Sequence, residues 1–184
     1  KSTAVGNDAL GSQNFTTATD THNTAVGYDA GQNITTSVQN TIVGSGAGDA
    51  ITSGTGQNTL IGKDAGGALT TGNQNVAIGK SAMHTDTLGN YSVAIGKNAL
   101  YRQNFTTATE VYNTVVGYAA GQEITTGDSN TLIGGLAGDA LNTGNSNTAV
   151  GLQALTADTK GDRNVALGYA ALAFQNFTTS TDSY

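Results

Sequence analysis

The 184-residue sequence has no proline, no cysteine and no tryptophan, and only 11% of its residues are charged. Without cysteine it can form neither a disulfide nor a thiolate zinc site. Without proline and a three-residue glycine period it cannot form a collagen helix. No apolar run approaches the roughly 20 residues of a membrane-spanning helix, so we expect no membrane insertion of this segment. The net charge of −6 argues against a nucleic-acid partner, because nucleic-acid binders are usually basic.

The sequence is instead rich in small and polar residues, with 26 glycines, 30 threonines and 18 asparagines, and these recur at a fixed period. The repeated motif is a polar residue, Thr or Val, two aliphatic residues, Gly, two variable residues and Ala. Its ten anchor glycines are Gly6, Gly27, Gly44, Gly62, Gly79, Gly96, Gly117, Gly134, Gly151 and Gly168. Most anchors lie 17 residues apart, and two copies carry a four-residue insertion. We number the copies coil 1 to coil 10 in chain order.

The apolar runs are short, β-branched and bounded by Gly or Asn, which predicts very short strands. A fixed period of this length is typical of a solenoid, in which each repeat stacks on its neighbours. We therefore predict an all-β fold, a parallel β-solenoid or β-roll of ten coils, with residues 1–184 forming a single repeat segment of a longer fibre. At one strand spacing per coil, the rod should be roughly 48 Å long.

Two columns of the repeat vary together, which predicts how the core is filled. Coils with a large residue two positions before the anchor glycine have Gly four positions after it; the large residues are Ile42, Leu60, Val115 and Leu132. Coils with Ala at the first position usually have a large residue at the second; these are Leu10, Met83, Leu100, Leu155 and Leu172. Because a close-packed interior conserves volume, we expect one large side chain per coil to fill a shared space from either side.

Both residues before each anchor glycine are apolar, although neighbouring strand residues point to opposite faces. We assign the structural core to the residue directly before the glycine, which is Val26, Val43, Ile61, Ile78, Ile95, Val116, Ile133, Val150 and Leu167 in coils 2 to 10. One of the two aliphatic ladders should then face outward, and a long exposed apolar patch usually marks an interface. We predict that parallel copies bury it in a homo-oligomer, a trimer. The alternative is a coil flat enough to bury both ladders.

The stretches Asn23–Gly27, Asn58–Gly62 and Ser92–Gly96 resemble the head repeats of YadA-like trimeric adhesins. The Thr-Gly-Asn-x-Asn spacers, such as residues 71–75, are similar to the repetitive shafts of phage tail fibres. The resemblance implies a left-handed β-roll, intertwined or packed as a parallel homotrimer. It also implies an extracellular location, on a virion tail fibre or a bacterial cell surface. The coil is longer here than in those heads, so its turns should be roomier.

The two insertions, and a third similar stretch in coil 10, carry Gln-Asn-Phe-Thr-Thr and are the best candidates for contact with a glycan or receptor. The aromatic residues in or beside them are Phe15, Phe105, Phe177, Tyr101 and Tyr112. Aromatic rings stack on sugars, while Asn and Thr hydrogen-bond sugar hydroxyls. The alternative is that each Phe packs over the core or against a neighbouring chain.

The sequence contains no recognisable catalytic constellation. His22 and His84 lie in different coils, and neither shares a motif with a nucleophile and an orienting acid. The Gly-Asp turns lack the nonapeptide pattern of calcium β-rolls. We therefore expect no enzyme activity, cofactor or metal site. Lys63, Lys80 and Lys97 share one column, and we interpret them as a solvated surface, with an anionic glycan as the alternative ligand.

These features favour a structural shaft or head of a trimeric extracellular fibre, with an adhesive or receptor-binding role toward a cell-surface glycan. The first alternative is a repeat scaffold of an extracellular filament that recognises no host. A second is an ice-binding solenoid, because a Thr or Asn lies eight residues after every anchor glycine. The mixture of Thr and Asn makes that face irregular and disfavours this alternative.

Overall fold

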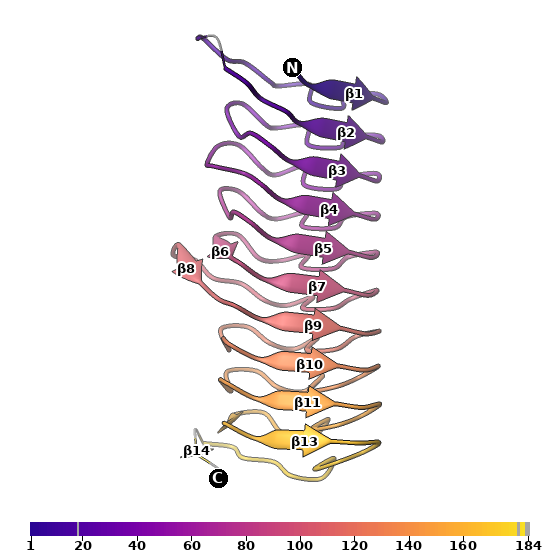
Figure 1. Cartoon of the computed structure of the whole chain (residues 1–184), viewed down its shortest axis with the longest axis vertical. Coiled ribbons are helices and arrows are strands. Elements are labelled where there is room, and N and C mark those ends of the chain that lie inside the picture. Colours follow the sequence, from indigo (N-terminus) through magenta and orange to yellow (C-terminus); the bar gives the residue numbers. More distant parts are fainter. Residues whose placement is uncertain (18, 180, 183–184) are drawn as a thin grey trace.

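The computed structural model describes every residue except 18, 180, 183 and 184, and for residues 181–182 it describes the backbone alone. The described chain is a parallel β-solenoid of stacked coils without a helix, as predicted (Figure 1). Each coil contributes one three-residue strand to a ten-stranded sheet. The strands are β1 (Thr3–Val5), β2 (Thr24–Val26), β3 (Thr41–Val43), β4 (Thr59–Ile61), β5 (Val76–Ile78), β7 (Val93–Ile95), β9 (Thr114–Val116), β10 (Thr131–Ile133), β11 (Thr148–Val150) and β13 (Val165–Leu167).

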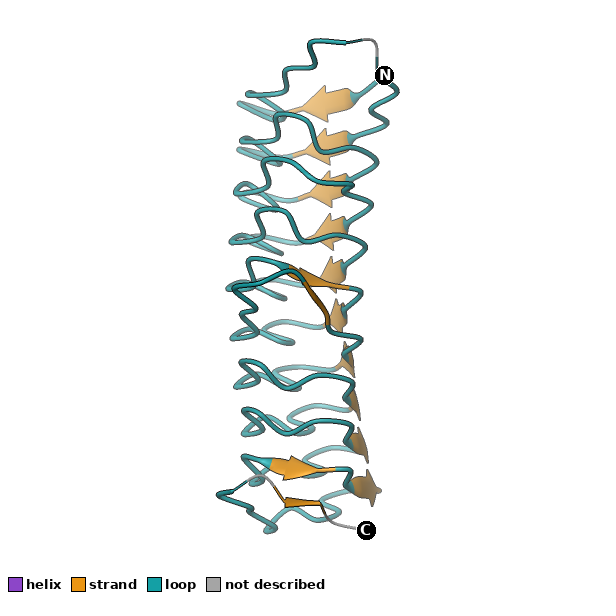
Figure 2. Ribbon diagram, turned by 90° about the vertical axis from the view of Figure 1, so that its left-hand side faces the viewer, coloured by secondary structure: helices purple, strands orange, loops and turns teal. Residues whose placement is uncertain are grey.

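Successive strands pair in parallel with matching columns in register, so Ala77 lies beside Ala94 and Ile78 beside Ile95. The rest of each coil winds through turns on the other sides of the rod (Figure 2). Two small sheets form where an extended coil follows a shorter one. β6 (Gly89–Asn90) pairs with β8 (Thr109–Glu110), and β12 (Gly161–Asp162) pairs with β14 (Thr181–Asp182).

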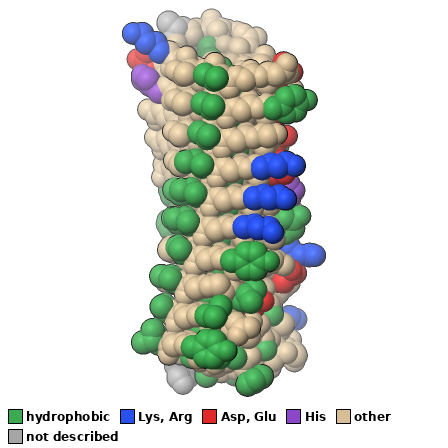
Figure 3. Space-filling model, turned by 90° about the vertical axis from the view of Figure 1, so that its right-hand side faces the viewer, with side chains coloured by type: hydrophobic (Ala, Val, Ile, Leu, Met, Phe, Trp, Pro, Cys, Tyr) green, Lys and Arg blue, Asp and Glu red, His purple; other side chains and the backbone are tan. Residues whose placement is uncertain are grey.

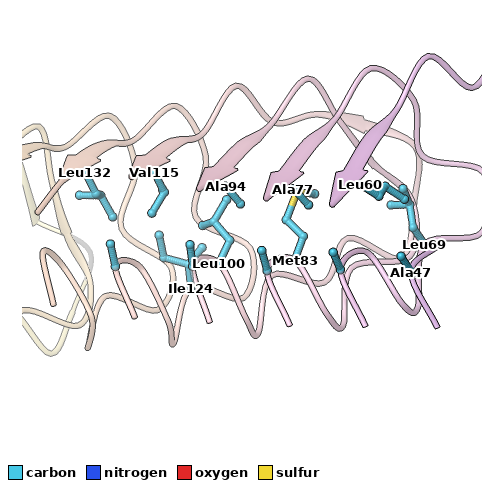
Figure 4. Packing of buried hydrophobic residues seen from close by; sticks show 14 of the residues in the cluster. Ala47, Leu60, Leu69, Ala77, Met83, Ala94, Leu100, Val115, Ile124 and Leu132 are labelled. Atoms are coloured by element: carbon cyan, nitrogen blue, oxygen red, sulfur yellow. The ribbon is translucent and has the colours of Figure 1, made fainter. Parts of the chain in front are cut away.

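The core runs along the axis of the rod and is lined by the residue two positions before each anchor glycine. We call this column the inner ladder; its members in coils 2 to 9 have no exposed surface, and they are Ala25, Ile42, Leu60, Ala77, Ala94, Val115, Leu132 and Ala149. The alanine three positions after the glycine faces it and is also buried, as at Ala47 and Ala82. Figure 4 shows these side chains meeting inside the coils.

The predicted assignment of the core was wrong by one residue. We call the residue directly before each anchor glycine the outer ladder; Val26, Ile133 and Leu167 in it are 36%, 40% and 77% exposed. All the residues that the sequence assigned to the core are exposed or half-buried instead; they are Val26, Val43, Ile61, Ile78, Ile95, Val116, Ile133, Val150 and Leu167. In a strand of three residues the central one faces the interior, so both neighbours must face outward. The alternative of a coil that buries both ladders is therefore wrong as well.

The predicted exchange of core filling between two columns is confirmed. A Cβ atom built on Gly66 would lie 2.9 Å from Cδ2 of Leu60, which occupies the space in that coil. In the next coil the inner residue is Ala77, and Met83 points toward it from the position equivalent to Gly66 (Figure 4). Met83 has a φ of 49°, a left-handed conformation that glycine adopts readily and other residues rarely do. The backbone at this position is therefore constant, while the source of the core side chain changes.

Candidate functional site

The outer ladder forms a continuous apolar ridge along the rod. Figure 3 shows a line of hydrophobic side chains on one face, beside a short row of basic ones. The ridge exists because every strand has the same residue class in the same register. Its most exposed members lie near the ends, where Val5 and Leu167 are 57% and 77% exposed, and neighbouring aliphatic residues cover each other in the middle. Such a long in-register apolar surface is a candidate interface.

The basic row beside this ridge consists of Lys63, Lys80 and Lys97, all exposed, in the position directly after the anchor glycine. The Nζ atom of Lys97 lies 5.7 Å from the ring centroid of Tyr118 in the next coil. The Nζ atom of Lys63 lies 3.8 Å from Oδ2 of Asp64. The exposure agrees with a solvated surface, and binding of an anionic glycan stays a prediction.

The phenylalanines of the extended coils are less available than the sequence suggested. Phe105 is 7% exposed, and its N–H donates to Oδ1 of Asp86 at 3.1 Å. Phe15 and Phe177 are half-buried. A Cβ on Gly161 would lie 2.8 Å from Cδ2 of Phe177, so this ring packs against the preceding coil. The burial of Phe105 agrees with the alternative of a packing role, and Phe177 also packs within the chain.

The tyrosines beside the loops remain partly accessible. Tyr112 is 53% exposed and stacks on Tyr91, with ring centroids 5.4 Å apart. Its hydroxyl donates to Oε2 of Glu110 at 2.7 Å, and this hydrogen bond raises the pKa of Tyr112 above its ordinary value. Tyr101 stacks on His84 with centroids 5.3 Å apart. Tyr112 and Tyr101 therefore belong to two separate aromatic pairs.

Tyr101 also lines a shallow, open depression on the rod surface, together with Thr85, Arg102, Asn104 and Thr125. The Nε atom of Arg102 lies 2.9 Å from Oε2 of Glu123, which holds the guanidinium at the rim. One aromatic face surrounded by hydroxyl, amide and guanidinium groups can stack on a sugar ring and hydrogen-bond its hydroxyls. Of the five predicted contact residues, the depression includes Tyr101 alone.

A buried ladder of asparagines closes the coils, and in the sequence it is visible only as the polar start of the motif. Asn130 donates from Nδ2 to the carbonyl oxygen of Gly144 in its own coil at 2.9 Å. Its Oδ1 accepts the backbone N–H of Asn147 in the next coil, also at 2.9 Å. The same pattern links Asn23, Asn40, Asn58 and Asn75. The signal was present in the near-constant Asn before each strand, because buried amides persist where every polar group is paired.

The second polar feature is a pair of fully buried aspartates, Asp86 and Asp158. No motif around them in the sequence predicts a function. Each accepts hydrogen bonds from the glutamine 17 residues later, Gln103 and Gln175 respectively. Burial raises the pKa of Asp86 above its ordinary value, although Gln103 and backbone N–H groups partly oppose this effect.

Within the part of the chain that the structure describes, no group of three or more His, Cys, Asp or Glu residues is arranged to hold a metal ion. The described residues also contain no helix of the length and apolar character needed to cross a membrane. His84 contacts Tyr101 and the carbonyl oxygen of Asp64, and His22 is exposed in a different coil. Comparison with protein-family models, curated proteins and solved structures finds no match to this chain.

Proposed function

We propose that this chain forms the structural shaft or head of an extracellular fibre in which three parallel copies of a left-handed solenoid pack along their outer ladders. The observation that carries the proposal is the apolar ridge, which stays partly exposed over ten strands of a single chain. Apolar area left in water favours association, and in-register columns let identical ridges meet along their whole length. The resemblance to trimeric adhesins and tail-fibre shafts supports the same assembly and its location on a virion or bacterial surface.

The assembly is tested by measuring the mass of the protein in solution by light scattering and sedimentation at micromolar concentration. The wild-type chain should have three times its 18.4 kDa monomer mass. Ile78→Asp combined with Ile95→Asp should give monomers, because it places charges in the middle of the ridge. The matched control is Thr126→Asp with Thr36→Asp, at exposed positions outside the ridge, which should leave the trimer intact. A monomeric wild-type chain would refute the proposal.

An adhesive role is the second part of the proposal, and the depression beside Tyr101 supports it. The test is binding to an array of bacterial and host-cell polysaccharides. Arg102→Ala combined with Asn104→Ala removes two exposed polar groups from the rim and should abolish binding without changing the oligomer mass. Lys160→Ala, an exposed control in another coil, should bind normally. If the rim variant binds as wild type does, this depression is not the glycan site.

The hydroxyl ladder gives little support to an ice-binding surface. The hydroxyl of Thr70 donates to the carbonyl oxygen of Thr87 at 3.0 Å, and the hydroxyl of Thr35 donates to the carbonyl oxygen of Thr52 at 2.9 Å. These protons link neighbouring coils instead of facing water. A host-independent filament scaffold would share the trimeric assembly but would show no binding on the polysaccharide array.

A further inference from the structure

Three of the seven lysine and arginine residues of this acidic chain gather in one column. They are the basic row, Lys63, Lys80 and Lys97, which are all exposed and follow the anchor glycines of three successive coils. The other cationic residues, which never occupy one column in neighbouring coils, are Lys1, Arg102, Lys160 and Arg163. Because the chain has a net charge of −6, the row is a local positive patch on a negative molecule.

Backbone hydrogen bonds between coils hold the basic row in line. The N–H of Ser81 donates to the carbonyl oxygen of Lys63 at 2.9 Å. In the next coil the N–H of Asn98 donates to the carbonyl oxygen of Lys80 at 3.1 Å. Ser81 and Asn98 each directly follow a lysine, and their φ values of 56° and 60° show that the chain turns sharply there. Successive lysines are therefore fixed one coil apart, at roughly 4.8 Å along the rod.

Only the first lysine of the row has a carboxylate beside it. The Nζ atom of Lys63 lies 3.8 Å from Oδ2 of Asp64, whereas the next two coils have uncharged residues in the column of Asp64. Among the residues that the structure describes, neither Lys80 nor Lys97 forms a salt bridge. An anionic ligand therefore competes with no internal ion pair at these two lysines.

Exposed tyrosines flank the row in the same column. Tyr118, in the coil after Lys97, is 55% exposed, and Tyr28, two coils before Lys63, is 59% exposed. The Nζ atom of Lys97 lies 5.7 Å from the ring centroid of Tyr118, so a positive charge and an aromatic face lie side by side. An aromatic ring stacks on the face of a sugar, and a lysine pairs with an acidic group on it. This column therefore presents both elements that recognise an acidic sugar.

We propose that the basic row and its flanking tyrosines bind an acidic polysaccharide that carries a carboxylate on each sugar and lies parallel to the rod. An extended chain of linked sugars advances by nearly one strand spacing per ring, so successive carboxylates can follow successive lysines. Double-stranded DNA fits less well, because its phosphates wind around a helix instead of following a straight row. The site lies within one chain and is separate from the depression beside Tyr101, so it depends on neither the trimer nor that depression.

The test measures binding of polygalacturonate to the full chain by titration calorimetry, with the fully methyl-esterified polymer as the uncharged control ligand. Lys80→Gln combined with Lys97→Gln should weaken binding by about tenfold, because an exposed ion pair contributes up to about fivefold. Lys1→Gln combined with Lys160→Gln, at exposed positions outside the row, changes the net charge equally and should alter binding by less than about twofold. The affinity of the wild type should fall as salt is added, since exposed charges are screened.

A second pair of variants adds one charge in place of removing two. Ser45→Lys extends the row by one coil and should tighten binding by about two- to fivefold, whereas Thr36→Lys adds the same charge at an exposed position in another column and should not. Equal effects of these two variants would overturn the proposal, because net charge alone would then explain binding. Three other results would also overturn it: no binding of polygalacturonate to the wild type, equal binding of the methyl ester, or tighter binding of single-stranded DNA. The oligomer mass of every variant is measured alongside, so that a change in assembly is recognised.

Discussion

Moving one large side chain across a coil is the most direct test of how the core is filled. In coil 4 Leu60 is fully buried, and the three atoms nearest to a Cβ on Gly66 all belong to it. In coil 5 the small residue, Ala77, comes before the anchor glycine, and the large residue, Met83, comes after it. The φ values of Gly66 and Met83 are 60° and 49°, so the backbone already suits the exchange. The variant Leu60→Ala with Gly66→Met would give coil 4 the filling that coil 5 uses.

The single changes should both be costly. Leu60→Ala removes a buried side chain and should lower the free energy of unfolding by about 2–5 kcal/mol. Gly66→Met overpacks the space around Leu60, which costs about 1–3 kcal/mol, and adds about 1–2 kcal/mol for a left-handed residue with a Cβ. In the double variant the cavity and the overlap cancel, and mainly the backbone contribution remains. The coupling free energy should therefore be favourable by about 3 kcal/mol or more, the sum of the cavity and overlap costs.

The assay is guanidinium unfolding followed by circular dichroism. Because repeat arrays need not unfold in one step, exchange of the Gly66 amide, which donates to Ala82 at 2.9 Å, provides a local measure. Leu60→Ala combined with Gly138→Met is the control, since Gly138 faces Leu132 in coil 8 and the two effects should add. If the Leu60→Ala, Gly66→Met variant is also destabilised by the full sum, the two columns do not share one space.

Three further predictions concern single residues. Gly79→Ala should destabilise the fold by at least about 1 kcal/mol more than Gly168→Ala in denaturant unfolding, and equal losses would refute the stacking argument. Both glycines have positive φ, but a Cβ on Gly79 would lie 2.6 Å from the Gly96 carbonyl oxygen, whereas one on Gly168 meets nothing within 4 Å. Asn130→Ala leaves buried groups unpaired and should lower the free energy of unfolding by about 2 kcal/mol or more. The control, Asn33→Ala at an exposed position, should lower it by about 0.5 kcal/mol or less. Similar losses of stability in the two variants would show that the buried ladder contributes little. Burial raises the pKa of Asp86 in the folded state, so the folded protein binds more protons just above the ordinary aspartate pKa. The stability from this group is therefore fully present below the unfolded-state pKa and is lost as pH rises through the folded-state pKa. Between pH 4 and pH 7, the free energy of unfolding should fall less with rising pH in Asp86→Asn than in the wild type. An equal fall in the two proteins would contradict the assignment.

Much of the fold could be predicted from the sequence because a solenoid repeats one local pattern. The anchor glycines, the in-register parallel strands and the exchange between Leu60 and Met83 all leave columns that can be compared within one chain. The candidate site was less predictable. The sequence left open whether Phe105 contacts a ligand or packs, and the structure buries it where Asp86 and Thr87 of the preceding coil hold its backbone in place. That contact joins residues 18 or 19 positions apart, so the local motif around Phe105 gave no sign of it.

The sequence by itself determined the period, the strand positions and the volume that each coil must bury. Only the tertiary structure decided which of two adjacent aliphatic columns faces inward. Both columns have the same composition class, and alternation along a strand states only that they face opposite ways. The curvature of the coil places Ile42 and its equivalents against the alanine column, and leaves Val43 and its equivalents outside. The tertiary structure also paired Asp86 with Gln103, because a buried carboxylate is tolerated only where donors from another coil reach it.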